Sequence, residues 1–444
     1  MKSHQASDAY YLLTFFVVVI FLGSWALCLP NAWMGVPGYQ RPIAYIDALF
    51  TAASAVCVTG LITVDTAGFS LFGQTVIMAL IQVGGLGIIS FTSILLTIPG
   101  GRLPLRRLRT IQSFYVDGVE FDPKKIVRSI VFFTLLIESA GAGLLYMEFK
   151  NSGVSRPAFA AVFHSISAFC NAGFSVFSPG LRDHAENAAV LGTISVLIVL
   201  GGIGFIVIQD IERCFRGKRR KLSYHSRVVL GMTAFLIIFG AIAFWLLERN
   251  GAYGDLGLLD TVMNALFQSI TPRTAGFDSV LQSSLSQPSK VLTILLMFIG
   301  GAPGSIAGGI KVTTAFVVAI VMLRRPNARG DIAMFRRSLS SKTTNDAVVY
   351  FLKAAALLML SAGALSLIEG LRGVDFSVIV FESVSAFGTV GLSLGLTPEL
   401  SAAGKLVIIG TMFAGRVGLI AIAFPGAGWR TNAMSYPQGN ILLG

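Results

Sequence analysis

Ala55-Val-Cys-Val-Thr-Gly-Leu61 is a short glycine-containing stretch at the end of a modest apolar segment, and diverged copies of it return three times along the chain. The copies are Ala168-Phe-Cys-Asn-Ala-Gly-Phe174, Thr271-Pro-Arg-Thr-Ala-Gly-Phe277 and Ala386-Phe-Gly-Thr-Val-Gly-Leu392. Each has a small or β-branched residue before its last glycine and a large apolar residue after it. The motif returns about every hundred residues, which predicts four similar units.

The composition of the chain is that of a membrane protein. Of its 444 residues, 54% are hydrophobic and only 13% are charged, and the mean hydropathy is +0.75. Soluble proteins of this length are less apolar and carry about 25% charged residues. The first apolar run, residues 10–30, has no charged side chain and is long enough to cross a bilayer as a helix. It is too long for a cleavable signal, and no clear small-x-small cleavage site follows it.

Each unit repeats one order of apolar segments: a long segment, a short one that leads into the glycine motif, and another long one. The expected segments are residues 10–30, 46–57 and 71–98; 126–147, 158–170 and 188–211; 228–247, 259–270 and 291–323; and 347–368, 376–387 and 402–424. The short segments have about 12 residues, too few to span a bilayer, so we expect them to be re-entrant pore helices.

Basic side chains indicate the topology. Residues 102–128, 213–227 and 324–342 hold seven, seven and six Lys and Arg, together 20 of the 34 in the chain. All three segments lie between units, so by the positive-inside rule every unit begins and ends in the cytoplasm. A net charge of +12 that gathers in such loops indicates topology and lipid headgroups rather than nucleic-acid binding.

These patterns predict an all-α membrane protein with eight transmembrane helices and four re-entrant pore helices around one central pore. The units are expected at residues 1–100, 101–215, 216–325 and 326–444, the last with a C-terminal tail. Both termini would lie in the cytoplasm. Asp47, Asp260 and Asp375 near the starts of three short segments, and Ser155 and Pro157 in the fourth, are expected to stabilise helix starts.

The repeated motifs are expected to form a cation filter. Backbone that is not helical is tolerated at membrane depth only where protein buries it or where it lines a watery path. Each re-entrant helix ends at a motif, so the negative ends of four helix dipoles meet at one centre, which favours a cation. Glycine lets the chain turn its carbonyl oxygens toward that centre, where rings of carbonyls replace the hydration water of an ion. The expected filter residues, with K+ bound at their carbonyl oxygens, are Val58, Thr59, Gly60, Asn171, Ala172, Gly173, Thr274, Ala275, Gly276, Thr389, Val390 and Gly391.

Glycines also permit close helix packing in membranes, which is the alternative interpretation of every glycine cluster. We assign it to Gly84-Gly85-Leu86-Gly87 and to Gly201-Gly202-Ile203-Gly204, which lie inside long apolar segments. It explains the four recurrent motifs poorly. Neither cluster completes the GxGxxG pattern of a dinucleotide site.

The cysteines and histidines indicate no metal or redox site. The cysteines fit no zinc or redox spacing, although Cys57 and Cys170 occupy matching places three residues before a motif glycine. A disulfide or metal pair is one interpretation of those two, and small apolar side chains are the favoured one. The histidines show no ligand pairing, and we expect His164 to pack or to form hydrogen bonds within a pore helix.

The fourfold pattern of helix, pore helix and helix resembles the Trk/Ktr/HKT superfamily of potassium transporters. The motifs TPRTAGF at 271–277 and SAFGTVGL at 385–392 carry this resemblance, which covers nearly the whole chain and is closest to the KtrB-type membrane subunits. All four filter glycines are present, a pattern that this family associates with potassium, whereas a serine in the first motif marks sodium-selective plant relatives. The third motif departs from the others, because Phe267 precedes Gly276 by one residue fewer than the corresponding Phe does elsewhere.

A gate below the filter is the second expected element. Residues 300–309 interrupt the last segment of the third unit with five glycines and a proline, which cannot continue a regular helix. Ile310 separates Gly309 from Lys311, so the stretch is not a Walker A phosphate loop. The resemblance implies an intramembrane loop that blocks the pore, and a packing kink is the alternative. The expected gate residues are Gly300, Gly301, Gly304, Ser305, Gly308, Gly309 and Arg416.

Arg416 lies in the last apolar segment. An arginine in a membrane costs at least about 2.5 kcal/mol and should face a cavity or a partner. The resemblance implies a place below the filter as an electrostatic barrier, and a role in binding carbonyls of the broken helix does not exclude it. Lys311 is expected close to the gate. Asp65 and Asp278 either attract cations at the outer mouth or are solvated loop acids.

The resulting prediction is a potassium-uptake protein of a bacterial-type inner, or cytoplasmic, membrane. It is not an enzyme, because no convincing His, Cys or carboxylate cluster is present. The resemblance implies a homodimer with one pore per protomer and a separate cytosolic RCK-type regulatory subunit that binds ATP or ADP, since the chain contains no nucleotide-binding domain. No cofactor is expected apart from K+ as the transported ion, with Na+ as a candidate activator. The alternatives are a sodium-selective or non-selective cation transporter of the same fold, and an alternating-access carrier, against which four units of one orientation argue.

Overall fold

The computed structural model describes residues 4–35, 42–95, 123–178, 180–217, 221–254, 256–325, 327, 331–334 and 337–417. Within these ranges the chain is helical apart from one two-stranded antiparallel hairpin. The elements are α1 (His4–Leu27), η1 (Pro30–Ala32), α2 (Tyr45–Val56), η2 (Thr66–Gly68), α3 (Leu71–Leu95), α5 (Pro123–Asn151), α6 (Pro157–Phe169), η3 (Arg182–His184), α7 (Ala188–Gly202), α8 (Phe205–Phe215), α9 (Tyr224–Glu248), α10 (Leu258–Ile270), η4 (Gln282–Ser284), α11 (Gln287–Phe298), α12 (Val312–Leu323), β1 (Ile332–Met334), β2 (Arg337–Leu339), α13 (Ser341–Glu369), η5 (Gly370–Arg372), α14 (Phe376–Gly388), η6 (Thr397–Glu399) and α15 (Ala402–Val417).

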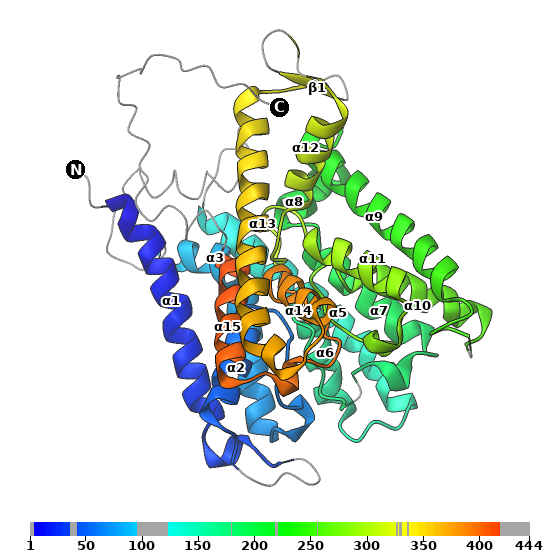
Figure 1. The fold of residues 1–444 in the computed structure, drawn as a ribbon. Helices are drawn as coiled ribbons and strands as arrows, with labels where there is room; N and C mark the ends of the chain where they lie inside the picture. The colour runs from blue at the N-terminus through cyan, green and yellow to red at the C-terminus, as the bar shows by residue number, and fades with distance from the viewer. Residues whose placement is uncertain are drawn as a thin grey trace.

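The helices fall into four repeats with the predicted order. Repeat 1 consists of α1, α2 and α3, and repeat 4 of α13, α14 and α15. Repeat 2 consists of α5, α6 and α7 with α8, and repeat 3 of α9, α10 and α11 with α12. The second helix of each repeat is the expected short pore helix. In Figure 1 the long helices α1 and α9 run along opposite edges of the molecule, α13 runs in front of the other helices, and the fourth pore helix α14 lies between α13 and α11.

A glutamate near the end of the first helix fixes the start of the last helix in three repeats. In each case its carboxylate accepts a hydrogen bond from the residue just before the last helix. The pairs are Glu148–Asn187, Glu248–Ser286 and Glu369–Ser401, at 3.3, 2.8 and 2.9 Å. A carboxylate is favoured there because the N-terminus of a helix carries a partial positive charge. The first and last helices of these repeats are therefore joined on the side of the molecule where the pore helices begin.

The pore helices are buried, whereas the long outer helices expose apolar side chains. Phe50, Phe163, Phe267 and Phe381, one in each pore helix, have no exposed surface. By contrast Phe21, Phe132, Phe235 and Met359 on the outer helices are between 52% and 71% exposed. An apolar surface of this extent is stable against lipid and not against water.

Three helices in the described part of the chain are long and apolar enough to cross a membrane: α5, α9 and α13. The bent pair α7 and α8 makes a fourth if the two are counted as one span. The break between α11 and α12 lies where residues 300–309 predicted it.

Helix α7 corrects one interpretation of the sequence. The glycines at 201–204 were expected inside a continuous apolar helix, but the helix ends at Gly202 and α8 leaves at an angle of 98°. Gly204 at the bend has φ +85°, a left-handed conformation that favours glycine. The bend releases the carbonyl groups of Gly201 and Gly202 from the helix, and both accept hydrogen bonds from residues of the 300–309 loop.

The predicted packing role of the two glycine clusters is confirmed at Gly84 and Gly201, each of which packs against a pore helix. A Cβ added at either would lie closer than 3.0 Å to a backbone carbonyl oxygen at the C-terminus of a pore helix, and the same is true of Gly415 in repeat 4. The contacting pairs are Gly84 with Val56, Gly201 with Phe169 and Gly415 with Phe387. At these positions the last helices of repeats 1, 2 and 4 thus approach the pore helices closely through their backbones.

Several smaller expectations can be compared with the structure. Asp375 is the N-cap of α14 and accepts a hydrogen bond from the Ser377 amide, as expected, and Pro157 opens α6. Asp47 and Asp260 lie in the first turns of α2 and α10, as expected, and Asp47 also forms an ion pair of 2.5 Å with Lys405 of α15, which joins repeat 4 to repeat 1. Most of the basic segment 102–128 and the end of the last apolar segment, residues 418–424, lie outside the described residues, as does the C-terminal tail.

The glycine contact in α15 can be tested by adding one methyl group. Gly415→Ala should lower the free energy of unfolding by about 1–3 kcal/mol, because the new Cβ would collide with the Phe387 carbonyl. Gly410→Ala on the same helix meets no atom within 4 Å and should be neutral or slightly stabilising. Thermal unfolding of the purified protein in detergent measures both. Equal unfolding temperatures for the two variants would contradict the packing assignment.

Candidate functional site

The four glycine motifs share one unusual backbone conformation. The residue two places before each motif glycine has a positive φ, and within the described ranges no other non-glycine residue does. These residues are Val58, Asn171, Thr274 and Thr389, with φ of 55°, 56°, 73° and 49°. Left-handed backbone costs about 1 kcal/mol or more for such side chains, and β-branched residues adopt it rarely. Strain of this kind, repeated at four equivalent places, marks a functional segment.

The motif glycines pack against one another in a closed ring. A Cβ added at any of them would lie closer than 3.0 Å to the carbonyl oxygen of the residue that precedes the glycine of the next motif. The contacts are Gly60 with Ala172, Gly173 with Ala275, Gly276 with Val390 and Gly391 with Thr59. The order runs from repeat 1 through repeat 4 and returns to repeat 1. The four motifs therefore surround one common axis, and glycine is required at each for both its φ and its lack of a side chain.

Hydroxyl groups at the ends of the pore helices hold the backbone of the motifs. In repeats 1 and 4 the serine hydroxyl accepts a hydrogen bond from the motif glycine amide, at 3.0 Å for Ser54 and 3.1 Å for Ser385. In repeats 2 and 3 the hydroxyl donates to the carbonyl of the residue after the glycine, at 2.8 Å for both Ser167 and Thr271. Each motif is thus attached to the helix that leads into it.

The third motif is one residue shorter than the others, and the missing residue lies between Thr271 and Thr274, before the filter residues. Thr271 lies five residues before its glycine, whereas Ser54, Ser167 and Ser385 lie six residues before theirs. The positive φ still falls two residues before Gly276, at Thr274, as in the other motifs. The ring contacts are preserved, so the deletion changes the end of α10 and leaves the register of the motif unchanged.

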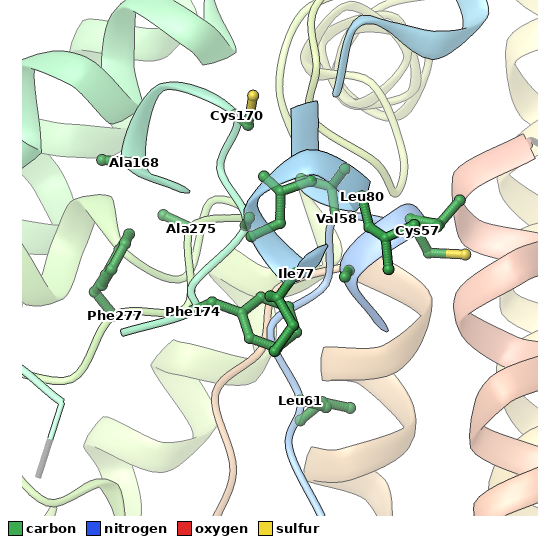
Figure 2. Packing of buried hydrophobic residues seen from close by; sticks show 14 of the residues in the cluster. Cys57, Val58, Leu61, Ile77, Leu80, Ala168, Cys170, Phe174, Ala275 and Phe277 are labelled. Atoms are coloured by element: carbon green, nitrogen blue, oxygen red, sulfur yellow. The ribbon is translucent and has the colours of Figure 1, made fainter. Parts of the chain in front are cut away.

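Apolar residues surround the motifs. Leu61, Phe174 and Phe277, which follow the glycines of the first three motifs, belong to one buried cluster (Figure 2). Cys57 and Cys170 are buried and form no disulfide, in agreement with the interpretation as small buried side chains. Among the described residues no three His, Cys, Asp or Glu side chains gather as a metal site.

The loop between α11 and α12 lies against the fourth motif. A Cβ at Gly308 would collide with the side chain of Thr389, and Gly309 approaches Gly388. The loop is held by backbone hydrogen bonds of Ala302 N to Gly202 O at 2.9 Å and of Ile306 N to Gly201 O at 3.4 Å. All of the expected gate glycines lie in this loop, directly beside the ring of motifs.

Arg416 binds the same loop from the opposite side. Its guanidinium donates to the carbonyl of Ile306 and to the carbonyl of Gly84 in α3, the latter at 2.5 Å. Lys311 donates from Nζ to the Ala307 carbonyl at 2.5 Å. Arg416 and Lys311 therefore bind the carbonyls of two consecutive loop residues, and the carbonyl-binding role considered for Arg416 is present in the structure.

A cavity opens beside this loop and receives both cations. Gly85, Phe205, Ser305, Lys311 and Arg416 are among the residues that line it, and no carboxylate is among the lining residues. The two side chains place positive charge at this cavity, in a setting of low dielectric where like charges repel strongly.

Polar contacts join neighbouring repeats at the other end of the ring. Ser178 of repeat 2 donates to Asp65 of repeat 1, and Arg182 of repeat 2 forms an ion pair of 3.2 Å with Asp278 of repeat 3. Burial raises the pKa of Asp278 to about 6, although the Arg182 charge opposes the shift. Asp65 and Asp278 are thus engaged by partners and are not simply solvated loop acids.

The chain matches the TrkH cation transport protein family over residues 16–427. It belongs to this family. The Ktr system potassium uptake protein B of Bacillus subtilis is 37% identical over 433 residues, which is 97% of this chain and 95% of that protein. The potassium/sodium uptake protein NtpJ of Enterococcus hirae is 36% identical, with 97% and 95% coverage.

The TrkH family fold is also found by structure. The crystal structure of the potassium transporter TrkH from Vibrio parahaemolyticus superposes with a TM-score of 0.74 and covers 95% of this chain and 86% of that one. The sequence identity is 19%, so this similarity concerns the fold alone. The predicted family and the mostly helical membrane fold are confirmed.

Two features of this TrkH family member were not predicted. The hydroxyls of Ser54, Ser167, Thr271 and Ser385 were not singled out, although a Ser or Thr at nearly constant spacing before each motif glycine is visible in the sequence. The bend at Gly204 was not predicted either, although the glycines at 201, 202 and 204 permit one, because the loop that binds the bend lies about a hundred residues further along the chain.

Acidification tests the burial of Asp278. The pKa of this group is higher in the folded protein than in the unfolded chain, so its ionised form destabilises the fold at neutral pH, and this cost decreases below about pH 6 and is gone only below the ordinary pKa of 3.8. Asp278→Asn should therefore unfold at a higher temperature than the native protein at about pH 7.5, and the difference should decrease below about pH 6 and vanish only near pH 3.

The Arg182→Gln background provides the control for this measurement. Without the Arg182 charge the pKa of Asp278 should rise further, so the advantage of Asp278→Asn at about pH 7.5 should grow. A difference in unfolding temperature that does not depend on pH would contradict the assignment.

Proposed function

We propose that this protein takes up potassium ions across the cytoplasmic membrane, through a filter formed by the four glycine motifs. The observation that carries the proposal is the closed ring of contacts between each motif glycine and the carbonyl of the next motif. The names of the relatives agree with it, since the Bacillus subtilis protein is a potassium uptake protein of the Ktr system.

The proposed filter binds the ion through backbone oxygens. The carbonyls of Thr59, Ala172, Ala275 and Val390 lie in the ring, one from each repeat. Carbonyl oxygens replace the water around a cation without a fixed negative charge, which suits an ion that loses its hydration shell easily. The pore helices end at the motifs, and the negative ends of their dipoles add a favourable potential for a cation.

The proposed gate combines the 300–309 loop with Arg416 and Lys311. The loop lies against the fourth motif, and its carbonyls hold both cations close to the path below the filter. A cation passes only if the loop moves and carries these charges aside. The transport is driven by the ion gradient and the membrane voltage.

The proposed assembly is a homodimer with one pore in each protomer and a cytosolic RCK-type subunit that binds ATP or ADP. The similarity to proteins named as components of a Ktr system supports the existence of such partners. Both termini and the basic segments would face the cytoplasm, where the regulatory subunit acts on the gate, and Na+ is a candidate activator.

A mixed sodium and potassium transporter is the second candidate function. It is favoured by the similarity to the Enterococcus hirae protein, whose name includes both ions. The difference between the two candidates lies in the geometry of the ring, which growth and flux measurements test directly.

Expression in cells that lack potassium uptake should restore growth at low external potassium. Gly60→Ser should reduce this rescue and lower the K+ to Na+ permeability ratio on the order of tenfold, a change of about 1.4 kcal/mol, since its side chain would displace the Ala172 carbonyl. Growth and tracer-ion uptake measure these effects. Sodium uptake without rescue by the native protein would exclude the potassium function, and an unchanged ratio in Gly60→Ser would exclude the filter.

Removal of a gate charge or of part of the loop should raise the flux. Arg416→Gln leaves one positive charge below the filter instead of two, and deletion of residues 303–307 removes the segment that Arg416 binds. Each should increase uptake into vesicles several-fold, because the repulsion of the ion falls. The exposed Arg324 at the end of α12 serves as the control, and Arg324→Gln should transport as the native protein does. Unchanged or lower flux in folded Arg416→Gln and deletion variants would contradict the gate.

A further inference from the structure

One position of the pore helices is polar and buried in all four repeats. It directly follows the buried Phe of each pore helix and is occupied by Thr51, His164, Gln268 and Glu382. None of the four is more than 1% exposed. A polar side chain in an apolar helix is costly to bury unless it forms hydrogen bonds, so its partners indicate its role.

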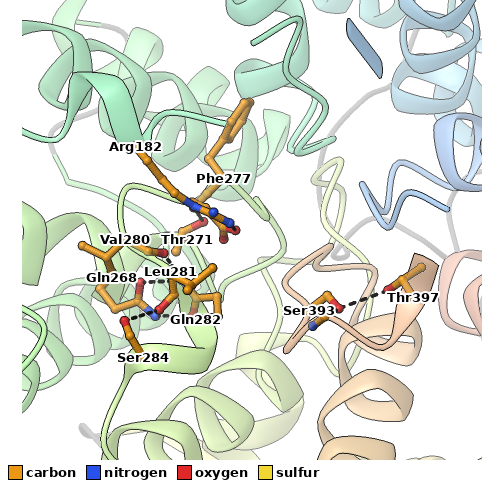
Figure 3. A network of polar contacts seen from close by, with 12 residues as sticks. Arg182, Gln268, Thr271, Phe277, Val280, Leu281, Gln282, Ser284, Ser393 and Thr397 are labelled. Carbon is orange, nitrogen blue, oxygen red and sulfur yellow. Dashed lines mark hydrogen bonds and ion pairs between the residues drawn. The ribbon is translucent and has the colours of Figure 1, made fainter. Parts of the chain in front are cut away.

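In repeat 4 the partners lie in the segment that leaves the filter. Glu382 Oε1 accepts hydrogen bonds from the Ser393 hydroxyl, the Thr397 amide at 3.1 Å and the Thr397 hydroxyl at 3.0 Å. Ser393 lies two residues after Gly391 and also accepts a hydrogen bond from the amide of Gly395 at 2.9 Å. The Thr397 hydroxyl also lies 3.2 Å from the Ser393 hydroxyl (Figure 3), so its single proton is shared between Glu382 and Ser393. One carboxylate oxygen on the fourth pore helix therefore binds the segment that follows the fourth motif.

Repeat 2 contains the same arrangement with different side chains. His164 Nε2 lies 2.9 Å from the hydroxyl of Ser175, which is two residues after Gly173. Nδ1 of His164 faces the Ala160 carbonyl at 2.8 Å, so Nδ1 carries the proton and Nε2 accepts from Ser175. The Ser175 hydroxyl in turn accepts from the amide of Phe177 at 3.0 Å, as Ser393 does from Gly395.

In repeat 3 the pore-helix side chain binds the loop residue that corresponds to Thr397. In repeat 1 the pore-helix side chain binds no loop residue. Gln268 and Gln282 exchange two hydrogen bonds of 2.9 and 3.1 Å (Figure 3), and Gln282 follows its motif glycine by six residues, as Thr397 does. The hydroxyl of Thr51 has no hydrogen-bond partner among the described residues. The loop of repeat 1 is instead held by Ser178 of repeat 2, through Asp65.

We propose that Glu382, His164 and Gln268 are positioning residues that fix the outer end of the ion filter and thereby its selectivity. This inference rests on the proposed filter. In repeats 2, 3 and 4 a hydroxyl at the end of the pore helix holds the motif, and the side chain at this position holds the segment that follows the motif. Carbonyls fixed at both ends cannot move inward to surround a smaller ion, so sodium remains poorly coordinated. Glu382 contributes most, because it accepts three hydrogen bonds.

The test compares Glu382 variants of the full chain in vesicles of phospholipid, with the K+ to Na+ permeability ratio as the readout. Glu382→Ala should lower the ratio about tenfold, since it removes three hydrogen bonds to one segment. Glu382→Gln should stay within about twofold of the native ratio, because glutamine already serves at this position in repeat 3. Ser393→Ala removes a single donor and should lower the ratio about threefold.

Thr51→Ala is the matched control, since it changes the same position in the repeat where the side chain has no partner. It should leave the ratio unchanged. The unfolding temperature of each variant is measured in parallel. A lower unfolding temperature with a native ratio in Glu382→Ala would show a merely structural residue and overturn the proposal.

The Gly60→Ser variant separates this inference from the filter itself. If Gly60→Ser changes the ratio while Glu382→Ala and Ser393→Ala do not, the positioning role is wrong and the filter stands. If none of the three changes it, both proposals are wrong. If Glu382→Ala does not fold, Ser393→Ala decides alone, and an unchanged ratio in that variant overturns the inference.

Discussion

The structure depends on the contact between each motif glycine and a carbonyl oxygen of the next repeat. Because this contact leaves no space for a Cβ, the four motifs approach one axis more closely than any other residue would permit. The pore helices must then end at the same centre, and the long helices must enclose them. A change at one glycine is transmitted to the next repeat, since the ring is closed and each carbonyl belongs to a different motif.

Irregular backbone at this depth is stable because the polar groups of one irregular segment form hydrogen bonds with those of another. The end of α7 offers free carbonyls at Gly201 and Gly202, and the 300–309 loop has amides that no helix satisfies. The two segments pair, and Arg416 and Lys311 bind carbonyls of the loop that remain. The cost of burying unpaired polar groups without water is therefore avoided without regular secondary structure.

Much of this arrangement could be predicted from the sequence, because its signals are local and repeated. The four motifs, the short segments before them and the glycine-rich break at 300–309 each predicted an element that the structure contains at that place. The bend at Gly204 and the ion pair of Asp47 with Lys405 could not be predicted, because both arise from contacts between residues that are distant along the chain. Gln268 and Glu382 could have been found by aligning the four repeats on their buried Phe, which shows a polar residue at the same place each time.

Helix α8 and the 300–309 loop share a hydrogen bond, since the amide of Phe205 at the start of α8 donates to the carbonyl of Gly304 at 3.2 Å. The orientation of α8 and the position of the loop are therefore thermodynamically linked: a force that reorients the helix changes the stability of the closed loop, and the reverse holds equally. The far end of α8, Phe215, lies within the basic segment 213–227. A tilt of this helix would therefore alter the hydrogen bonding of the 300–309 loop at its other end.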